Sequence, residues 1–273
     1  MPETSARKVI CHRVNPVTGA LREGRVCIGA LSISFPCAPV AQIYAQAGFS
    51  WFYMDMEHSQ LSYDQVREIS YASKLAGIVP VAGPTSLSDH LIARPLDAGA
   101  MGVVAPHVET ADQTELVVNS SRYPPMGKRG LIAQGPPSNF EAANSAEWVE
   151  EQNKEILVAV KVESGTGIDN VEEIASVPGL DAIIIGPGDL SATLGIPGQT
   201  DHPDMIDCIE RMLAATKRQG IAGGPHVSTP EQAAHWVERG ATFMSLNFDG
   251  AMLLETSQRT VGELRGYLGS RML

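Results

Sequence analysis

Two acidic residues in the middle of the chain follow short apolar runs. Glu163 ends the run LVAVKVE (157–163), and Asp189 follows the run AIIIGPG (182–188). About 26 positions and a helix-length segment separate them, which predicts neighbouring strands of a parallel sheet. Carboxylates at the ends of buried strands are costly to desolvate, and a divalent cation that prefers oxygen ligands would bind both. The alternative is that one acid caps a helix and the other pairs with Lys161.

A histidine follows the earlier segment MDMEH (54–58), which is predicted to end another strand. His58 would leave this strand at the same rim, within reach of Asp55 or of Asp97. A carboxylate that holds an imidazole in one tautomer makes it a general base. A purely structural histidine is the other interpretation.

Two loops add candidate binding groups. The turn formed by Gly186, Pro187 and Gly188 exposes backbone N–H groups beside the predicted metal position, and such a turn can hold a substrate carboxylate. An ordinary tight turn has the same composition. The loop 120–130 carries Arg122, Lys128 and Arg129 and would shape the entrance of the site or a subunit contact; a solvated loop is the alternative.

The elements that position these groups form a repeating pattern. Helical segments, among them 63–76, 203–219 and 230–240, separate most of the predicted strands. Eight such units in about 250 residues predict a (β/α)8 barrel, an α/β fold, as a single domain over 1–273 with an N-terminal extension at 1–24. The stretch 131–155 is too long for a simple unit. The eight predicted strands are 26–34, 50–56, 77–82, 102–106, 156–163, 181–186, 220–224 and 242–247.

Strand periodicity predicts which side chains enter the barrel. Successive residues of a strand point to opposite faces, so Lys161 and Glu163 face inward together with Tyr53, Asp55 and Glu57. Charged groups in the upper interior of a barrel are where catalytic residues are expected. The residues predicted to pack outward on the helices are Phe52, Met54, Met56, Val158, Val160 and Val162.

Composition narrows the class of protein. The net charge of −11 argues against a nucleic-acid partner, because phosphate binding needs a basic face. No apolar run approaches the roughly 20 residues of a membrane span, and the first residues do not resemble a signal peptide. The four cysteines have no metal-ligand spacing, so reduced structural thiols in a cytoplasmic protein are expected.

Taken together, these segments resemble the HpcH/HpaI aldolase family of metal-dependent pyruvate aldolases. The resemblance implies a (β/α)8 barrel assembled as a homo-oligomer, a hexamer made of three dimers that exchange a C-terminal helix. The segments that carry it are GFSWFYMDMEH (48–58), RYPPMGKRG (122–130), KVESGTGIDNVEEI (161–174), DAIIIGPGDLSATLG (181–195) and the His-Pro at 202–203.

The resemblance also implies roles for individual residues. Glu163 and Asp189 would hold a divalent cation (Mg, Mn, Co or Zn), and backbone N–H groups of Gly188 and Asp189 would bind the substrate carboxylate. His58, oriented by Asp97 and close to Asp55, would act as acid and base through water. The implied reaction joins the enolate of pyruvate to an aldehyde, or cleaves a 4-hydroxy-2-oxo acid, so the partners are a small 2-oxo acid and an aldehyde.

Several positions depart from the family pattern. The arginine expected at the end of strand three is Gly83, and losing such a donor costs about 3–4 kcal/mol of transition-state stabilisation. Lys161 replaces the usual glutamine and would supply the missing cation; the alternatives are that it pairs with Glu163 or another interior acid, or forms a Schiff base. The segment 131–142 differs from its counterpart in relatives, and His107 is placed to reach the site.

These departures leave two other functions open. One is a relative with altered chemistry, such as a 2-oxo acid decarboxylase or another carbon–carbon lyase. The other is a protein that binds metal and an oxo acid without turnover. The presence of His58, Asp97, Glu163 and Asp189 together favours an enzyme.

Overall fold

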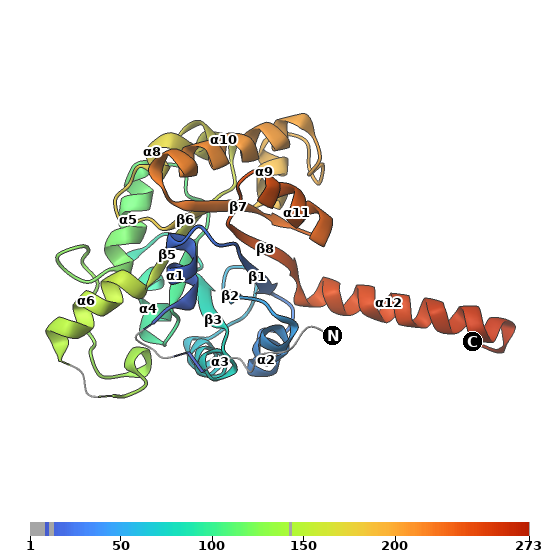
Figure 1. Cartoon of the computed structure of the whole chain (residues 1–273), viewed down its shortest axis with the longest axis horizontal. Coiled ribbons are helices and arrows are strands. Elements are labelled where there is room, and N and C mark those ends of the chain that lie inside the picture. Colours follow the sequence, from blue (N-terminus) through green and yellow to red (C-terminus); the bar gives the residue numbers. More distant parts are fainter. Residues whose placement is uncertain (1–8, 11–13, 142–143, 273) are drawn as a thin grey trace.

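Eight parallel strands close into a barrel in the order of the sequence, with helices around it (Figure 1). The computed structural model describes residues 9–10, 14–141 and 144–272. The predicted (β/α)8 barrel is confirmed. The strands are β1 (Cys27–Ser32), β2 (Trp51–Asp55), β3 (Val79–Gly83), β4 (Gly102–Ala105), β5 (Leu157–Val162), β6 (Ala182–Ile185), β7 (Ala222–Val227) and β8 (Phe243–Phe248).

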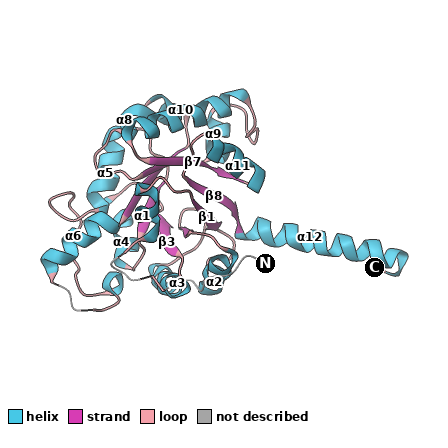
Figure 2. Cartoon of the chain, viewed as in Figure 1, coloured by secondary structure: helices cyan, strands magenta, loops and turns pink. Residues whose placement is uncertain are grey.

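Most of the helices form an outer layer around the strands, whereas α12 (Asp249–Leu268) projects away from it, as Figure 2 shows. Those predicted at 63–76 and 203–219 are confirmed with the same bounds. The stretch 131–155 is long because a loop with a 3-10 turn and a second helix follow β4 before β5 begins. The helices are α1 (Pro16–Arg22), α2 (Ala38–Ala47), α3 (Tyr63–Ala76), α4 (Asp89–Asp97), α5 (Ala111–Ser121), α6 (Ser145–Glu155), α7 (Gly165–Asp169), α8 (Val171–Ala175), α9 (Pro187–Thr193), α10 (Pro203–Gln219), α11 (Pro230–Glu238) and α12 (Asp249–Leu268), with 3-10 turns η1 (Pro136–Ser138) and η2 (Gly269–Arg271).

The alternation predicted for the strands is confirmed by two hydrophobic layers. The valines of β5 and the side chains of Phe52 and Met54 pack outward among the helices. Trp51 and Tyr53 belong to the inner layer, where the ring of Trp51 stacks on Phe243 with centroids 4.6 Å apart. This stack is possible only over a glycine, because a Cβ at Gly29 would lie 2.2 Å from the Trp51 ring. Large aromatic rings therefore fill the barrel interior towards the amino ends of the strands. The interior at the carboxyl ends of the strands is left for polar groups.

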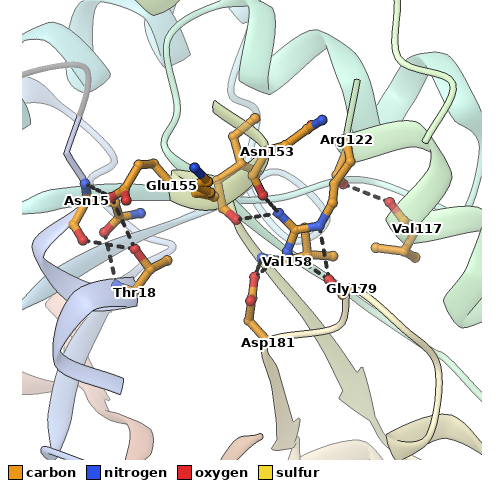
Figure 3. A network of polar contacts seen from close by, with 12 residues as sticks. Asn15, Thr18, Val117, Arg122, Asn153, Glu155, Val158, Gly179 and Asp181 are labelled. Atoms are coloured by element: carbon orange, nitrogen blue, oxygen red, sulfur yellow. Dashed lines mark hydrogen bonds and ion pairs between the residues drawn. The ribbon is translucent and has the colours of Figure 1, made fainter. Parts of the chain in front are cut away.

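At the amino ends of the strands, Arg122 holds neighbouring segments together, and Figure 3 shows it beside Asn153, Gly179 and Asp181. Its guanidinium donates to the carbonyls of Asn153 and Gly179 and to Oδ2 of Asp181 at 2.9 Å. Burial raises the pKa of Asp181, and Arg122 opposes this rise, as does the N–H of Val158 that donates to the same carboxylate. Arg122 is buried and holds the start of β5 against β6, so the prediction that it shapes the site entrance is wrong.

The last long helix, α12, leaves the barrel and extends away from it (Figure 1). Its first residue, Asp249, is its one buried side chain. Asp249 accepts hydrogen bonds from Ser32 Oγ at 2.6 Å and from the N–H groups of Ser34 and Phe35 at 3.0 and 2.7 Å. The helix is therefore tied to the loop after β1 at one end only.

The helices and cysteines of the described residues bear on two expectations from the sequence, those about membrane spans and about free thiols. None of the described helices combines the length and apolarity that crossing a membrane requires. Cys27, Cys37 and Cys208 are free thiols, as expected, whereas Cys11 lies outside the described residues. Burial raises the pKa of Cys27 to about 11, which keeps this thiol protonated and unreactive.

Candidate active site

A cavity of about 250 Å³ opens at the carboxyl ends of the strands. Its floor is apolar, whereas its wall carries acidic, basic and hydroxyl side chains. A second cavity of about 330 Å³ lies beside it and shares Pro187 and His226 with it. The residues that line the first cavity are Leu31, Ile33, Trp51, Tyr53, Asp55, His58, Val104, Lys161, Ile184, Gly186, Pro187, Gly188, Asp189, His226, Ser245 and Phe248.

Glu163 lies directly after β5 and is only 4% exposed. Its Oε2 accepts a hydrogen bond of 3.1 Å from the backbone N–H of His107, and its Oε1 is 3.5 Å from Nζ of Lys161. Burial raises the pKa of Glu163, although Lys161 and His107 oppose the rise. A Cβ at Gly186 would lie 2.2 Å from Oε1. The carboxylate therefore rests against the backbone of the turn after β6.

Asp189 follows that turn in the first helical turn of α9 and lines the cavity with an exposed side chain. Its charge adds to the rise in the pKa of Glu163 that burial causes. A pair of oxygen ligands fits a hard divalent cation that keeps several waters. Across the described residues, no group of three or more His, Cys, Asp or Glu side chains has an arrangement that could hold a metal ion by itself.

Lys161 enters the cavity from β5, with a side chain that is 12% exposed. Burial acts to lower its pKa, but the surrounding Tyr53, Glu163 and Asp55 outweigh burial and hold the pKa above its usual range. The amine is therefore protonated, whereas a Schiff base requires a neutral amine. The pairing with Glu163 that the sequence left open is formed.

Tyr53 explains the glycine at the end of β3. A Cβ at Gly83 would lie 2.0 Å from the Tyr53 hydroxyl and 2.4 Å from its Cζ. The phenol thus occupies the space that a side chain at position 83 would need. Nζ of Lys161 is 5.6 Å from the centroid of the same ring. Two of the departures from the family pattern, Gly83 and Lys161, therefore both lie beside the ring of Tyr53.

His58 lines the same cavity, and its side chain is about half exposed. Oδ1 of Asp55 accepts from the backbone N–H groups of Glu57 and His58 at 2.9 and 2.8 Å, which fixes the turn that carries the histidine. The carboxylate nearest to the His58 ring is Glu57, with Nε2 and Oε2 3.6 Å apart.

Asp97 does not orient His58 within this chain, so that prediction is wrong for a single subunit. Its Oδ1 accepts from Nη2 and Nε of Arg129 at 2.6 and 3.1 Å. Asp97 ends α4, and each helix of a (β/α)8 barrel returns the chain to the amino ends of the strands, opposite the catalytic rim. Asp97 lies only five residues before β4 begins, and this spacing could have indicated that it is at the amino ends of the strands.

His107 reaches the site, as the sequence suggested. It has a left-handed backbone conformation, with φ of 55°, which is unusual for a residue other than glycine. Its Nε2 is 2.7 Å from Oε1 of Glu57, and its Nδ1 is 3.4 Å from Oε2 of Glu163. The imidazole therefore links the carboxylate beside His58 to the predicted metal ligand.

Two polar cavity residues were missed by the sequence analysis, His226 and Ser245. Nδ1 of His226 and Oγ of Ser245 are 2.9 Å apart. The predicted strand stopped at residue 224, whereas β7 continues to Val227. Extending the alternation by one step from Gly224 would have placed His226 inside the barrel.

Comparison with known proteins agrees with this geometry. The sequence profile described as HpcH/HpaI aldolase/citrate lyase matches residues 37–256. The chain is 37% identical over 246 residues to a 2-keto-3-deoxy-L-rhamnonate aldolase of Escherichia coli O157:H7, covering 86% of this chain and 87% of that protein.

Solved structures show the same relation. The HpcH/HpaI aldolase from Desulfitobacterium hafniense DCB-2 has a TM-score of 0.86 and 31% identity, covering 90% of this chain and 95% of that one. A HpcH/HpaI aldolase/citrate lyase family protein from Burkholderia cenocepacia J2315 has a TM-score of 0.85 and 30% identity, covering 92% of this chain and 100% of that one. The chain belongs to the HpcH/HpaI aldolase/citrate lyase family.

Proposed function

We propose that this chain is a divalent-metal-dependent aldolase, a carbon–carbon lyase that forms or cleaves 4-hydroxy-2-oxo acids. The observation that carries the proposal is the buried carboxylate of Glu163, packed against Gly186 in the turn that leads to Asp189, beside a cavity that also contains two histidines and a lysine. Family membership and the rhamnonate aldolase relative support a reaction of this class. The substrates are a small 2-oxo acid of the pyruvate type and an aldehyde.

Glu163 and Asp189 would hold the cation, which is Mg, Mn, Co or Zn. When bound, the cation supplies Lewis-acid stabilisation of the enolate. The turn Gly186–Gly188 lines the cavity and orients the 2-oxo acid, with the backbone N–H groups of Gly188 and Asp189 directed at its carboxylate.

His58 moves the proton. In the synthetic direction it removes a proton from the methyl group of the 2-oxo acid through a water, and it returns that proton to the new hydroxyl after the carbon–carbon bond has formed. Asp55 serves this step indirectly, because its hydrogen bonds to the backbone of Glu57 and His58 fix where the imidazole stands. Glu57 is the carboxylate that stabilises the imidazolium within the chain.

Lys161 takes the place of the missing arginine in this scheme. Its side chain lines the cavity and enters it from β5, the strand that pairs with β6. Its raised pKa keeps the amine protonated, so it carries a positive charge there. Its ammonium would stabilise the negative charge that develops on the keto oxygen during enolate formation, an effect worth about 3–4 kcal/mol for a well-placed donor.

We further propose a cytoplasmic homo-oligomer, a hexamer built from dimers that exchange α12. The support is the helix itself, which leaves the barrel and exposes apolar side chains at Leu253, Leu254, Val261, Leu264 and Tyr267. Exposed apolar surface of this kind is typical of an interface between subunits. The net charge of −11 disfavours nucleic acid as a partner.

The test is the exchange of the methyl protons of pyruvate for deuterium in D2O with Mn²⁺, followed by NMR. Exchange needs the enolate but no aldehyde. We expect exchange in the wild type, its loss on chelation, and a fall of at least a hundredfold in Glu163→Gln. Glu238→Gln, which alters an exposed acid on α11, is the matched control and should exchange normally.

Other outcomes would identify the alternatives. Binding of pyruvate without exchange would indicate a non-catalytic binder. Release of carbon dioxide from a 2-oxo diacid, without aldol addition to any aldehyde, would indicate a decarboxylase. Exchange that survives complete chelation would remove Glu163 and Asp189 from the metal role.

A further inference from the structure

One polar pair in the cavity has no role in the proposed reaction so far. His226 lies on β7 and Ser245 on β8, and their side chains are in hydrogen-bond contact through Nδ1 and Oγ at 2.9 Å. Both line the cavity that contains Lys161 and Asp189. No other group in the described part of the chain bonds the His226 ring, so its Nε2 is available to a bound molecule.

The order of the strands sets His226 apart from His58. His58 follows β2, which lies across the barrel from β6, the strand that precedes Asp189. His226 belongs to β7, the immediate neighbour of β6. A substrate beside Asp189 therefore meets the two imidazoles from different directions.

His226 also stands where the two cavities adjoin, because it lines both together with Pro187. The first cavity contains the groups for the 2-oxo acid. The second, of about 330 Å³, offers room for a substituent that projects past His226. In the addition step, the carbonyl carbon of the aldehyde must lie next to the nucleophilic carbon of the enolate. The carbonyl oxygen would then be near His226, and the rest of the aldehyde would extend into the second cavity.

The protonation state of His226 suits a hydrogen-bond donor. Burial, and after it the charge of Lys161, lowers the pKa of His226 to about 4, so the ring is neutral at ordinary pH. A neutral imidazole has one N–H and one acceptor nitrogen. If the Ser245 hydroxyl donates to Nδ1, the proton lies on Nε2. A neutral imidazole held in this way can polarise a carbonyl, as in triosephosphate isomerase.

We propose that His226 is a further catalytic residue, which donates a hydrogen bond from Nε2 to the carbonyl oxygen of the aldehyde. The inference rests on the proposed aldolase function. As the enolate carbon attacks the carbonyl carbon, the electron pair of the C=O double bond moves to oxygen, and His226 stabilises the negative charge there. The proton that completes the hydroxyl is the one His58 removed from the methyl group, so His226 gains and loses none. Ser245 is a positioning residue that sets the tautomer.

The experiment separates enolate formation from addition. Methyl-proton exchange of pyruvate measures the first, and formation of the aldol product from pyruvate and glycolaldehyde measures the second, both with Mn²⁺. In His226→Ala we expect exchange within about twofold of the wild type and a loss of about a hundredfold or more in kcat/KM for glycolaldehyde. His90→Ala, which removes an exposed histidine on α4 that lines neither cavity, is the matched control for removing an imidazole.

A second variant tests whether donation is the role. In His226→Gln the side-chain amide places an N–H near the position of Nε2, and at least a tenfold recovery over His226→Ala is expected. Ser245→Ala should lower addition while leaving exchange unchanged. Thermal melting of each variant shows whether it is folded.

A third readout needs neither metal nor turnover. Side-chain ¹⁵N–¹H NMR of the histidines in the free protein should show His226 neutral at pH 7 with its proton on Nε2, and Ser245→Ala should change this tautomer. A proton on Nδ1 in the wild type would overturn the proposal.

The remaining outcomes are also decisive. Equal losses of exchange and addition in folded His226→Ala would overturn the proposal, because His226 would then serve enolate formation or the shape of the cavity. Unchanged addition, or no recovery in His226→Gln, would overturn it as well. An absence of exchange in the wild type would instead remove the aldolase function, and the role of His226 with it.

Discussion

Replacing Gly83 by alanine should disrupt the cavity through Tyr53. The new Cβ would lie 2.0 Å from the Tyr53 hydroxyl, whereas ordinary contact begins at 3.4 Å, so the ring must retreat by 3.4 − 2.0 = 1.4 Å. Its neighbours restrict this movement: Trp51 packs edge-on with centroids 6.2 Å apart, and Lys161 lies over the ring. Overpacking of this kind costs about 1–3 kcal/mol in the free energy of unfolding.

The measurement is urea unfolding of Gly83→Ala, Tyr53→Leu and the double variant. Leucine removes the hydroxyl and Cζ that the new Cβ would meet, so the cost of Gly83→Ala should fall by about 1 kcal/mol or more in the Tyr53→Leu background. Gly130→Ala is the control, because a Cβ there meets nothing within 4 Å. Methyl-proton exchange should also fall in Gly83→Ala, since a displaced ring moves Lys161.

Two results would refute this reasoning. A Gly83→Ala protein as stable and active as the wild type would show that Tyr53 has room to move. Strictly additive costs in the double variant would show that the two positions are independent and that the glycine is unrelated to the phenol.

Three further predictions concern other charged groups. Lys161→Gln should bind Mn²⁺ about tenfold or more tightly in calorimetry, because an ammonium 3.5 Å from Glu163 no longer competes with the cation; weaker binding would contradict this competition. Asp249→Asn should lower the free energy of unfolding by about 1–3 kcal/mol at pH 7. Despite burial, the hydrogen bonds from Ser32 and three backbone N–H groups lower the pKa of Asp249, so the difference from wild type should vanish as the pH falls through that pKa; a constant difference down to pH 2 would count against it. Burial lowers the pKa of Lys74 to about 8, whereas the unfolded chain keeps this proton to about pH 10.4. Unfolding in urea should therefore become harder by on the order of 2 kcal/mol between pH 8 and 10, and Lys74→Met should lack this rise.

The fold and the rim acids could be predicted because they depend on local pattern. Valine-rich strands between helices predict the barrel, and the alternation along β5 places Lys161 in the cavity, with Glu163 beside it directly after the strand. The Gly-rich turn after β6 carries Asp189 to the same end by the geometry of any parallel barrel. The family resemblance, made from the same segments, is confirmed by the profile over residues 37–256.

What the sequence did not predict depends on contacts between distant segments. The partner of Asp97 is Arg129, and Arg122 is buried against Asp181, because the loop 122–130 folds beneath the barrel rather than over its mouth. The close contact between Tyr53 and Gly83 joins β2 to β3, and the sequence of neither strand by itself indicates it. His226 was missed for a smaller reason, a strand predicted to end three residues too early.

The ion pair between Lys161 and Glu163 has a consequence for how the protein is made and stored. Glu163 is only 4% exposed, and a carboxylate buried to this extent normally needs a positive charge beside it for the chain to fold. In many metalloproteins the metal ion provides that charge. This chain encodes its own counter-charge two residues earlier, in β5. The barrel is therefore expected to assemble before any ion arrives, to melt at nearly the same temperature in chelator as in buffer, and to exchange one metal for another without unfolding.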